Sequence, residues 1–396
     1  MSEAVTTTAF YQPAARAIAV YLAQQLRILP GQQYRVVSAT CGPRVLVLSL
    51  QVNPAYAPRI TAMQEQLSMA VGLDREFRVR VLRGQRGNLA VEIPKPRGLW
   101  YNVPVAALPR RRGLVASLGL DADHRPQLLN FADPLAAHAL VVGATASGKT
   151  NVGRLLVYDL VSQNTPEQVR LLLIDTRKQG LGWRSFACVP HLLHPIIAEE
   201  QADARALAWA AAEIDRRAAE HRTTPRVFIC IDEAQALLDD PGLARLIADL
   251  ASVGRELGIH LIVAIQNPTA RQMGDSTIRA NLATRLVCKV MDGVTTRVAT
   301  GQSDSGAERL TGAGDMLLVQ QDRITRLTAA LVTGQDMAQL PRVEQTARLD
   351  LEACADPDRA RGAAEIVRAR RGPRPDPLEF DWSGNWWACW ARDRKS

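Results

Sequence analysis

Four short apolar runs, separated by longer segments with helical spacing, dominate the middle of the chain. They are ALVV at 139–142, RLLLID at 170–175, RVFICID at 226–232 and IHLIVAI at 259–265. Because each run is almost continuously apolar, we expect strands that are buried on both faces of a sheet. Strands that alternate with helices predict an α/β fold with a mostly parallel sheet.

The first hundred residues follow a different pattern. Helical spacing over 12–28 is followed by two strand-like runs, YRVVSAT and RVLVLSLQV, and a second helical segment precedes two more, FRVRVLR and NLAVEIP. This order predicts a small α/β domain. Arg78 and Arg80 alternate with valines, so we expect both on one strand face, where they form either contacts or a solvated surface.

The chain of 396 residues is longer than one compact core usually grows, so we expect more than one domain. The segment that begins with LPRRRG at 108 is polar and irregular, which favours a domain junction near 113. We predict a small N-terminal α/β domain at 1–113, a larger α/β domain at 114–340, and a C-terminal helix with a Trp-rich tail at 341–396.

The sequence GATASGKT at 143–150 fits the pattern G-x-x-x-x-G-K-[ST], and it lies between a predicted strand and a predicted helix. The glycines allow the backbone to turn its N–H groups around phosphate oxygens, and the start of the helix favours an anion. Lys149 is expected to reach the β- and γ-phosphates, and the Thr150 hydroxyl to bind Mg²⁺. The alternative is a chance match in a loop that binds nothing. The predicted nucleotide-binding residues are Gly143, Ala144, Thr145, Ala146, Ser147, Gly148, Lys149, Thr150 and Asn151.

Acidic and amide side chains follow two of the predicted strands. Asp232 and Glu233 come directly after one strand, and Gln266 comes after the next. Asp232 would bind the magnesium ion, and Glu233 would activate the attacking water as general base. Gln266 is placed to sense the γ-phosphate. The alternatives are an acidic pair that caps a helix and a glutamine that bonds to loop backbone.

Composition narrows the class of protein. A formal net charge of +8 favours a polyanionic partner, with nucleic acid ahead of an acidic membrane surface. The six cysteines form no C-x-x-C pair, which is typical of reduced thiols in a cytoplasmic protein. No apolar run approaches the roughly 20 residues of a membrane helix, so we expect no direct membrane insertion.

The chain resembles the FtsK/SpoIIIE-type DNA translocases of the FtsK–HerA superfamily of P-loop ATPases. The blocks TPEQVRLLLID, ICIDEAQALL, GRELGIHLIVAIQNP and ERLTGAGDMLL follow the phosphate loop in the order that this family shows, and the resemblance spans roughly 40–335. Ala146 stands where the family more often has Gly, which should be tolerated if its φ is below zero.

The resemblance implies a ring, usually hexameric, of RecA-like subunits that hydrolyse ATP at their interfaces and pull double-stranded DNA through a central channel. It also implies an arginine that acts on the neighbouring subunit. Arg255 matches the proposed position best, and Arg285 and Arg297 also fall in family blocks; a plain surface arginine is the alternative.

Channel loops of such a motor carry cations, because phosphates rather than bases are held. Two basic segments qualify, although basic loops are commonly just solvated. The predicted DNA contacts are Arg177, Lys178, Arg184, Arg271 and Arg279.

Three functions remain open at this stage. The first is an ATP-driven DNA translocase that transfers or maintains plasmid or mobile-element DNA. The second is a protein-secretion ATPase, and the third is a DNA-binding scaffold controlled by nucleotide. The tail, with Trp382, Trp386, Trp387 and Trp390, either docks on a partner protein or on bases, or packs on its own domain. His191 and His194 are three residues apart, but no further metal ligand is near them in the sequence.

Overall fold

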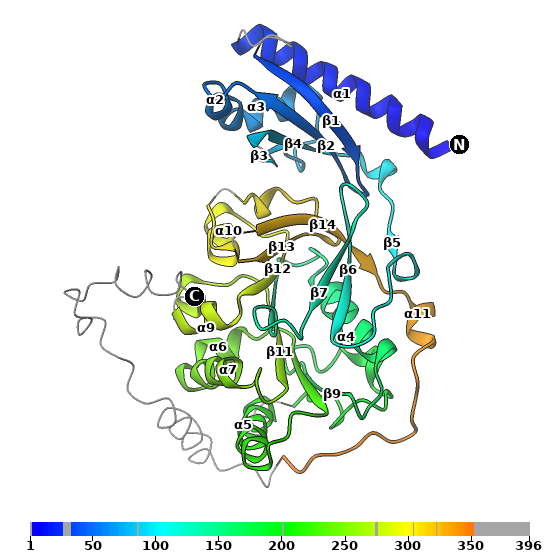
Figure 1. Cartoon of the computed structure of the whole chain (residues 1–396), viewed down its shortest axis with the longest axis vertical. Coiled ribbons are helices and arrows are strands. Elements are labelled where there is room, and N and C mark those ends of the chain that lie inside the picture. The colour runs from blue at the N-terminus through cyan, green and yellow to red at the C-terminus, as the bar shows by residue number, and fades with distance from the viewer. Residues whose placement is uncertain are drawn as a thin grey trace, which may run out of the picture.

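The computed structural model describes residues 2–26, 33–84, 87–199, 202–273, 276–303, 305–321 and 323–351. These residues build two β-sheets that follow one another along the long axis of the molecule (Figure 1). Of the segment predicted as a C-terminal helix and Trp-rich tail at 341–396, residues 341–351 form no helix, and the rest, with the tryptophans, lies outside the described residues. The predicted domain boundaries stay a prediction.

The first sheet is small and entirely antiparallel, with the strand order β1-β2-β4-β3. Its apolar face packs on α1 and α3, where Leu22 and Leu67 join Leu48 and Val91 of the strands in one buried cluster. The predicted second helix is interrupted at Met63, which separates α2 from α3. The elements are α1 (Ser2–Leu26), β1 (Tyr34–Cys41), β2 (Val45–Val52), α2 (Ala57–Ala62), α3 (Gln64–Val71), β3 (Arg80–Arg83) and β4 (Leu89–Pro94).

The second sheet has ten strands in the order β7-β6-β14-β13-β12-β8-β11-β10-β9, with β5 paired to β14. The five strands from β12 to β9 are parallel, whereas β13, β14, β6 and β7 are antiparallel to their neighbours. The parallel core predicted from the four apolar runs is therefore confirmed, and an antiparallel half extends it. The strands are β5 (Val103–Pro104), β6 (Val115–Asp121), β7 (Pro126–Asn130), β8 (Ala139–Val142), β9 (Val169–Ile174), β10 (Arg226–Ile231), β11 (Ile259–Ile265), β12 (Thr284–Cys288), β13 (Asp315–Gln320) and β14 (Arg323–Leu331).

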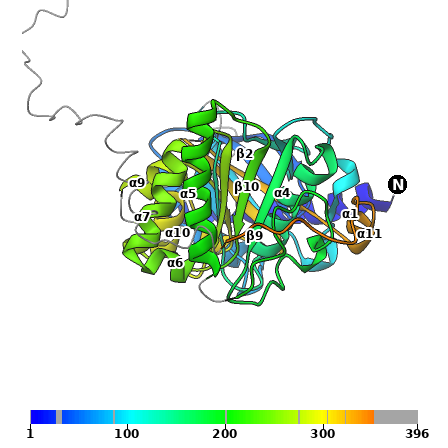
Figure 2. The same ribbon diagram turned by 90° about the horizontal axis from the view of Figure 1, so that it is seen from below.

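Helices cover both faces of the parallel strands, as Figure 2 shows with α4 on one side and α5 and α7 on the other. Alternate residues of β10 divide between the two cores: Val227, Ile229 and Ile231 face α5 and α7, while Phe228 and Cys230 belong to the core with α4. Burial on both faces explains why β10 is continuously apolar. The helices are α4 (Lys149–Gln163), α5 (Ala202–Glu220), α6 (Gln235–Asp239), α7 (Pro241–Val253), α8 (Ala270–Met273), α9 (Ser276–Asn281), α10 (Gly293–Thr300) and α11 (Gly334–Ala338), with short 3₁₀ turns at 97–99, 105–107, 184–186 and 307–309.

A buried chain of charges joins the two sheets. Glu92 of β4 accepts from Arg80 of β3 at 2.7 Å and from Arg326 of β14 at 2.6 Å. Arg326 also holds Asp315 of β13 through two hydrogen bonds, at 2.9 and 2.6 Å. Burial alone would raise the pKa of Asp315, but the Arg326 guanidinium keeps it below its usual range. The two sheets therefore share one ion network that excludes water.

This network changes the interpretation of the alternating arginines. Arg80 is 1% exposed and forms part of the junction, whereas Arg78 precedes the strand and pairs with Glu65 at the surface, at 3.0 Å. The two side chains were expected to share one role on one strand face. They have different roles because β3 begins only at Arg80.

Replacing Glu92 by Ala should destabilise the protein strongly. Two buried guanidinium groups would then face each other without their shared carboxylate, which typically costs about 3–5 kcal/mol. Urea unfolding measures the change, and Glu65→Ala is the matched control. Because the Glu65–Arg78 pair is exposed, that variant should lose at most about 1 kcal/mol. Equal losses in the two variants would show that the buried junction contributes nothing special.

Candidate nucleotide-binding site

The phosphate loop lies between β8 and α4 and is folded against the rest of the sheet. The N–H of Ala144 donates to the Lys289 carbonyl at 2.8 Å, and the Ser147 carbonyl accepts from the N–H of Gly314 at 2.9 Å. Gly148 has a φ of 102°, and a β-carbon there would lie 2.4 Å from the nitrogen of Gly314. The close approach and the positive φ both require glycine.

The backbone at Ala146 differs from the expectation. Its φ is 61°, in the left-handed region, so the condition under which alanine would be tolerated freely is not met. A non-glycine residue in this region costs roughly 1–2 kcal/mol. The preference for Gly at this position has a physical reason, and this chain carries local strain instead.

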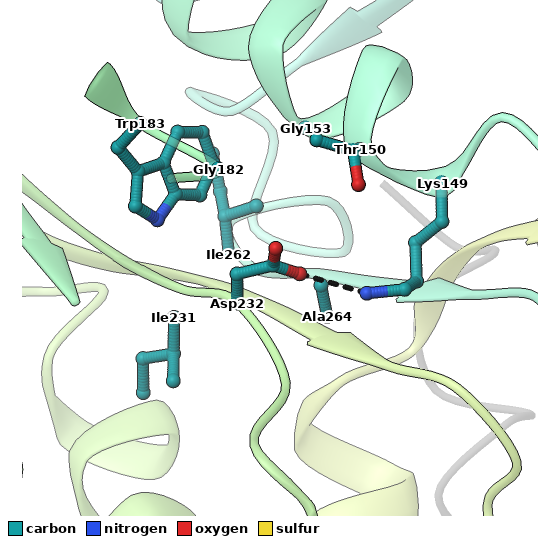
Figure 3. A pocket seen from close by; sticks show the side chains of 9 residues that line it. All are labelled: Lys149, Thr150, Gly153, Gly182, Trp183, Ile231, Asp232, Ile262 and Ala264. Atoms are coloured by element: carbon teal, nitrogen blue, oxygen red, sulfur yellow. Dashed lines mark hydrogen bonds and ion pairs between the residues drawn. The ribbon is translucent and has the colours of Figure 1, made fainter. Parts of the chain in front are cut away.

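Lys149 and Asp232 meet at the centre of the site. The Lys149 Nζ lies 2.7 Å from Asp232 Oδ1, and both side chains are about 5% exposed or less. Burial would raise the pKa of Asp232, but the ammonium of Lys149 holds it below its usual range. Figure 3 shows this pair, with Thr150 at the start of α4 above it. The structure thus brings together the predicted phosphate lysine and the predicted magnesium ligands.

Glu233 and Gln266 come together at the ends of β10 and β11. Gln266 Nε2 donates to Glu233 Oε1, and the same oxygen lies 2.6 Å from Lys178 Nζ. Glu233 has a φ of 55°, which is strained for a residue with a side chain. Because the parallel strands end at one edge of the sheet, residues 33 positions apart become neighbours.

One acidic residue of the site was missed by the sequence reasoning. Asp175 follows β9 directly and is fully buried, and its carboxylate accepts from the N–H groups of Lys178 at 3.0 Å and Gly182 at 2.9 Å. These bonds fold the loop after β9 back over the sheet edge. The signal was present, because Asp175 ends the run RLLLID just as Asp232 ends RVFICID.

A small pocket lies between the start of α4, the acidic strand end and the loop after β9. Its lining includes Lys149, Thr150 and Asp232 together with Gly182 and Trp183 (Figure 3). A β-carbon at Gly182 would come within 2.8 Å of Asp232 Oδ2, so the loop lies directly on the carboxylate.

The side chains present fit a nucleoside triphosphate with Mg²⁺. The first turn of α4 has N–H groups without intrahelical acceptors, the lysine supplies a cation, and a hydroxyl and a carboxylate supply oxygen ligands for a divalent ion. In the described arrangement Lys149 and Asp232 neutralise each other. This pair would have to part when phosphates take the lysine and Mg²⁺ takes the carboxylate.

The three candidate arginines lie in different environments. Arg255 precedes β11, whereas Gln266 follows it, so Arg255 is at the opposite edge of the sheet from the site. Its side chain is 41% exposed and donates to the Pro134 carbonyl at 3.3 Å. Arg285 is buried in β12 and donates to main-chain carbonyls of its own subunit. Arg297 is exposed on α10. The identity of the arginine that acts on a neighbouring subunit stays a prediction.

The residues predicted to contact DNA also differ in their exposure. Arg177 and Arg184 are exposed on the loop after β9, and Arg271 is exposed on α8. Lys178 instead points inward to the acidic residues. The side chain of Arg279 lies outside the part that the structure describes.

The histidines at 191 and 194 bond to backbone. His191 Nε2 lies 2.8 Å from the Asn164 carbonyl, and His194 Nδ1 lies 2.8 Å from that of Pro195. Within the described ranges, no group of three His, Cys, Asp or Glu side chains could hold a metal ion. The described part of the chain also has no helix with the length and apolarity to span a bilayer.

A parallel sheet with a phosphate loop between a strand and a helix, and with acidic residues at the ends of neighbouring strands, defines a P-loop ATPase with a RecA-like fold. Comparison with known proteins narrows the class. Residues 110–224 match the FtsK/SpoIIIE family. This match and the similarity to curated DNA translocases confirm the resemblance predicted from the sequence.

Curated relatives extend the similarity beyond this segment. The chain is 28% identical over 314 residues to the DNA translocase SftA of Bacillus subtilis (strain 168), and 27% identical over 364 residues to the DNA translocase FtsK of Corynebacterium efficiens. These alignments cover 72% and 82% of this chain, but the chain spans only 32% and 37% of the length of those relatives.

Solved structures share the fold. The conjugation coupling protein TcpA of pCW3, in its monomer form with ATPγS, has a TM-score of 0.52 at 16% identity, over 81% of this chain and 96% of TcpA. The cytoplasmic domain of the type VII secretion ATPase EccC from Thermomonospora curvata has a TM-score of 0.51 at 24% identity, over 68% of this chain and 32% of EccC.

Replacing Gly148 by Ala should weaken nucleotide binding strongly, because the added methyl group collides with the backbone at Gly314. Gly72→Ala is the matched control. Gly72 also has a positive φ, of 73°, but nothing lies within 4 Å of its β-position. Titration with a fluorescent ATP analogue should show at least about tenfold weaker binding for Gly148→Ala and unchanged binding for Gly72→Ala. Wild-type affinity in the Gly148 variant would contradict this account of the loop.

Proposed function

We propose that this chain is an ATP-driven motor that translocates along double-stranded DNA. The observation that carries the proposal is the meeting of Lys149, Asp232, Glu233 and Gln266 at one edge of the parallel sheet. Similarity to curated DNA translocases supports the choice of substrate, and the net charge of +8 is consistent with it.

The residues divide the work of ATP hydrolysis. Lys149 and the amides of the phosphate loop hold the β- and γ-phosphates, and Thr150 and Asp232 hold the magnesium ion, which neutralises phosphate charge when bound. Glu233 orients the attacking water and accepts its proton. Gln266 is bonded to Glu233 and is placed to sense the γ-phosphate.

The proposal includes assembly into a ring, most simply a hexamer, with ATP between subunits. Arg255 is our choice for the residue that stabilises the γ-phosphoryl group of the neighbour. It lies at the sheet edge away from its own phosphate loop, and β11 between them spans about 20 Å. A guanidinium this far from its own phosphate loop could act only on a nucleotide bound by a neighbouring subunit. Arg285 is less suited, because its own subunit buries it.

Exposed cations of the loop after β9, Arg177 and Arg184, are proposed to contact DNA phosphates. Such contacts carry no sequence information, which suits a motor that moves along any sequence. Service to plasmid or mobile-element DNA, and a partner for the Trp-rich tail, stay predictions from the sequence.

Hydrolysis with and without duplex DNA, followed by displacement of a third strand from a triplex, tests the proposal. We expect duplex DNA to raise the hydrolysis rate severalfold and the third strand to be displaced. Stimulation without displacement would favour a nucleotide-controlled scaffold, and indifference to DNA would favour protein secretion. Glu233→Gln is the control: it should bind ATP but fail to hydrolyse or displace, because the amide cannot accept the proton.

A further inference from the structure

Lys178 lies between the acidic residues of the site and the protein surface. Its Nζ is 2.6 Å from Glu233 Oε1 and 3.4 Å from Asp232 Oδ2. Burial would lower the pKa of Lys178, but these two carboxylates raise it. The side chain is nevertheless 33% exposed, unlike that of Lys149, which is 5% exposed.

The contact occupies the oxygen that a general base needs. Glu233 Oε1 accepts from both Lys178 and Gln266. While both donors hold this oxygen, they occupy the position at which an attacking water would be bound. The ammonium group of Lys178 thus compensates the charge of Glu233. Glu233 can bind the attacking water only when Lys178 moves away.

The loop that carries Lys178 is anchored, so its side chain can move without the backbone. Asp175 accepts from the N–H groups of Lys178 and Gly182, and Trp183 Nε1 donates to the Ile174 carbonyl at 3.1 Å. On the same loop Arg177, just before Lys178, is exposed to solvent. A polyanion that approaches Arg177 comes close to the ammonium of Lys178 as well.

The energetics allow the exchange of partners. Solvent screens an ion pair with one partner a third exposed, so this pair is weaker than a fully buried one. A DNA phosphate presents a full negative charge to the same ammonium. The ion pair is therefore strong enough to restrain Glu233 in the absence of DNA and weak enough to be replaced by a phosphate.

We propose that Lys178 is a positioning residue that restrains Glu233 until a DNA backbone phosphate takes its ammonium group, and that it thereby couples DNA contact to ATP hydrolysis. The inference rests on the proposed function, in that DNA is the activating polyanion. It assigns to Lys178 a role opposite to that of a simple DNA-contact cation, whose loss would leave hydrolysis without DNA unchanged.

Steady-state hydrolysis by the full chain, with and without duplex DNA, tests this coupling. Lys178→Met should raise the rate without DNA severalfold, toward the stimulated rate of the wild type, and DNA should add little more. Lys178→Arg keeps a cation beside Glu233 and should restore the low rate without DNA. Arg245→Met removes the same charge from the exposed surface of α7, away from the site, and should leave both rates unchanged.

The two possible failures look different. If wild-type hydrolysis is indifferent to duplex DNA, the proposed function fails, and the DNA half of the coupling fails with it. If DNA stimulates the wild type but Lys178→Met hydrolyses at or below the wild-type rate without DNA, the restraint is wrong. Binding of a fluorescent ATP analogue, measured on both Lys178 variants, ensures that the rates compare folded, nucleotide-competent proteins.

Discussion

The ends of parallel strands at one edge of a sheet are the constraint on which the site depends. Because β8, β9, β10 and β11 all run in the same direction, the residues that follow them meet: the phosphate loop, Asp175, Asp232 and Gln266. No local sequence pattern joins these residues, and only the order of the strands does. The ion pair of Lys149 with Asp232, buried at this edge, then fixes the spacing between the phosphate loop and the acidic residues.

The small antiparallel sheet is connected to this edge through the antiparallel half of the large sheet. Glu92 holds Arg326, Arg326 holds Asp315, and the residue before Asp315 donates to the phosphate loop at Ser147. Arg44 of the small sheet also donates to the Ala313 carbonyl at 2.9 Å. The loop at 311–315 is thus shared between the nucleotide site and the first sheet. A displacement of the first sheet should therefore also displace the nucleotide site, and the reverse, because buried ion networks resist the loss of any one partner.

Much of this arrangement could be predicted from the sequence, and the exceptions have physical reasons. The phosphate loop and the acidic strand ends have short-range patterns, so the sequence placed Lys149, Asp232, Glu233 and Gln266 beside predicted strands, and the structure brings these side chains together. The burial of Arg80 could not be found, because its partners, Glu92 and the Ser305 carbonyl, lie 12 and 225 positions away in the chain. The inward turn of Lys178 depends on the backbone bonds to Asp175, which a basic loop does not reveal. The antiparallel strands were missed because polar residues interrupt their apolar runs, as in RITRLTAAL of β14, even where the strand is buried.

The central claim is that the buried lysine and the acidic strand end form a site for a nucleoside triphosphate. Equilibrium titration of the wild type and of Lys149→Ala with a fluorescent ATP analogue and Mg²⁺ tests it most directly. The account predicts saturable binding to the wild type and its loss in the variant, because no other cation is buried beside the phosphate loop within the described residues. Equal binding by the two proteins, or none by the wild type, would contradict it.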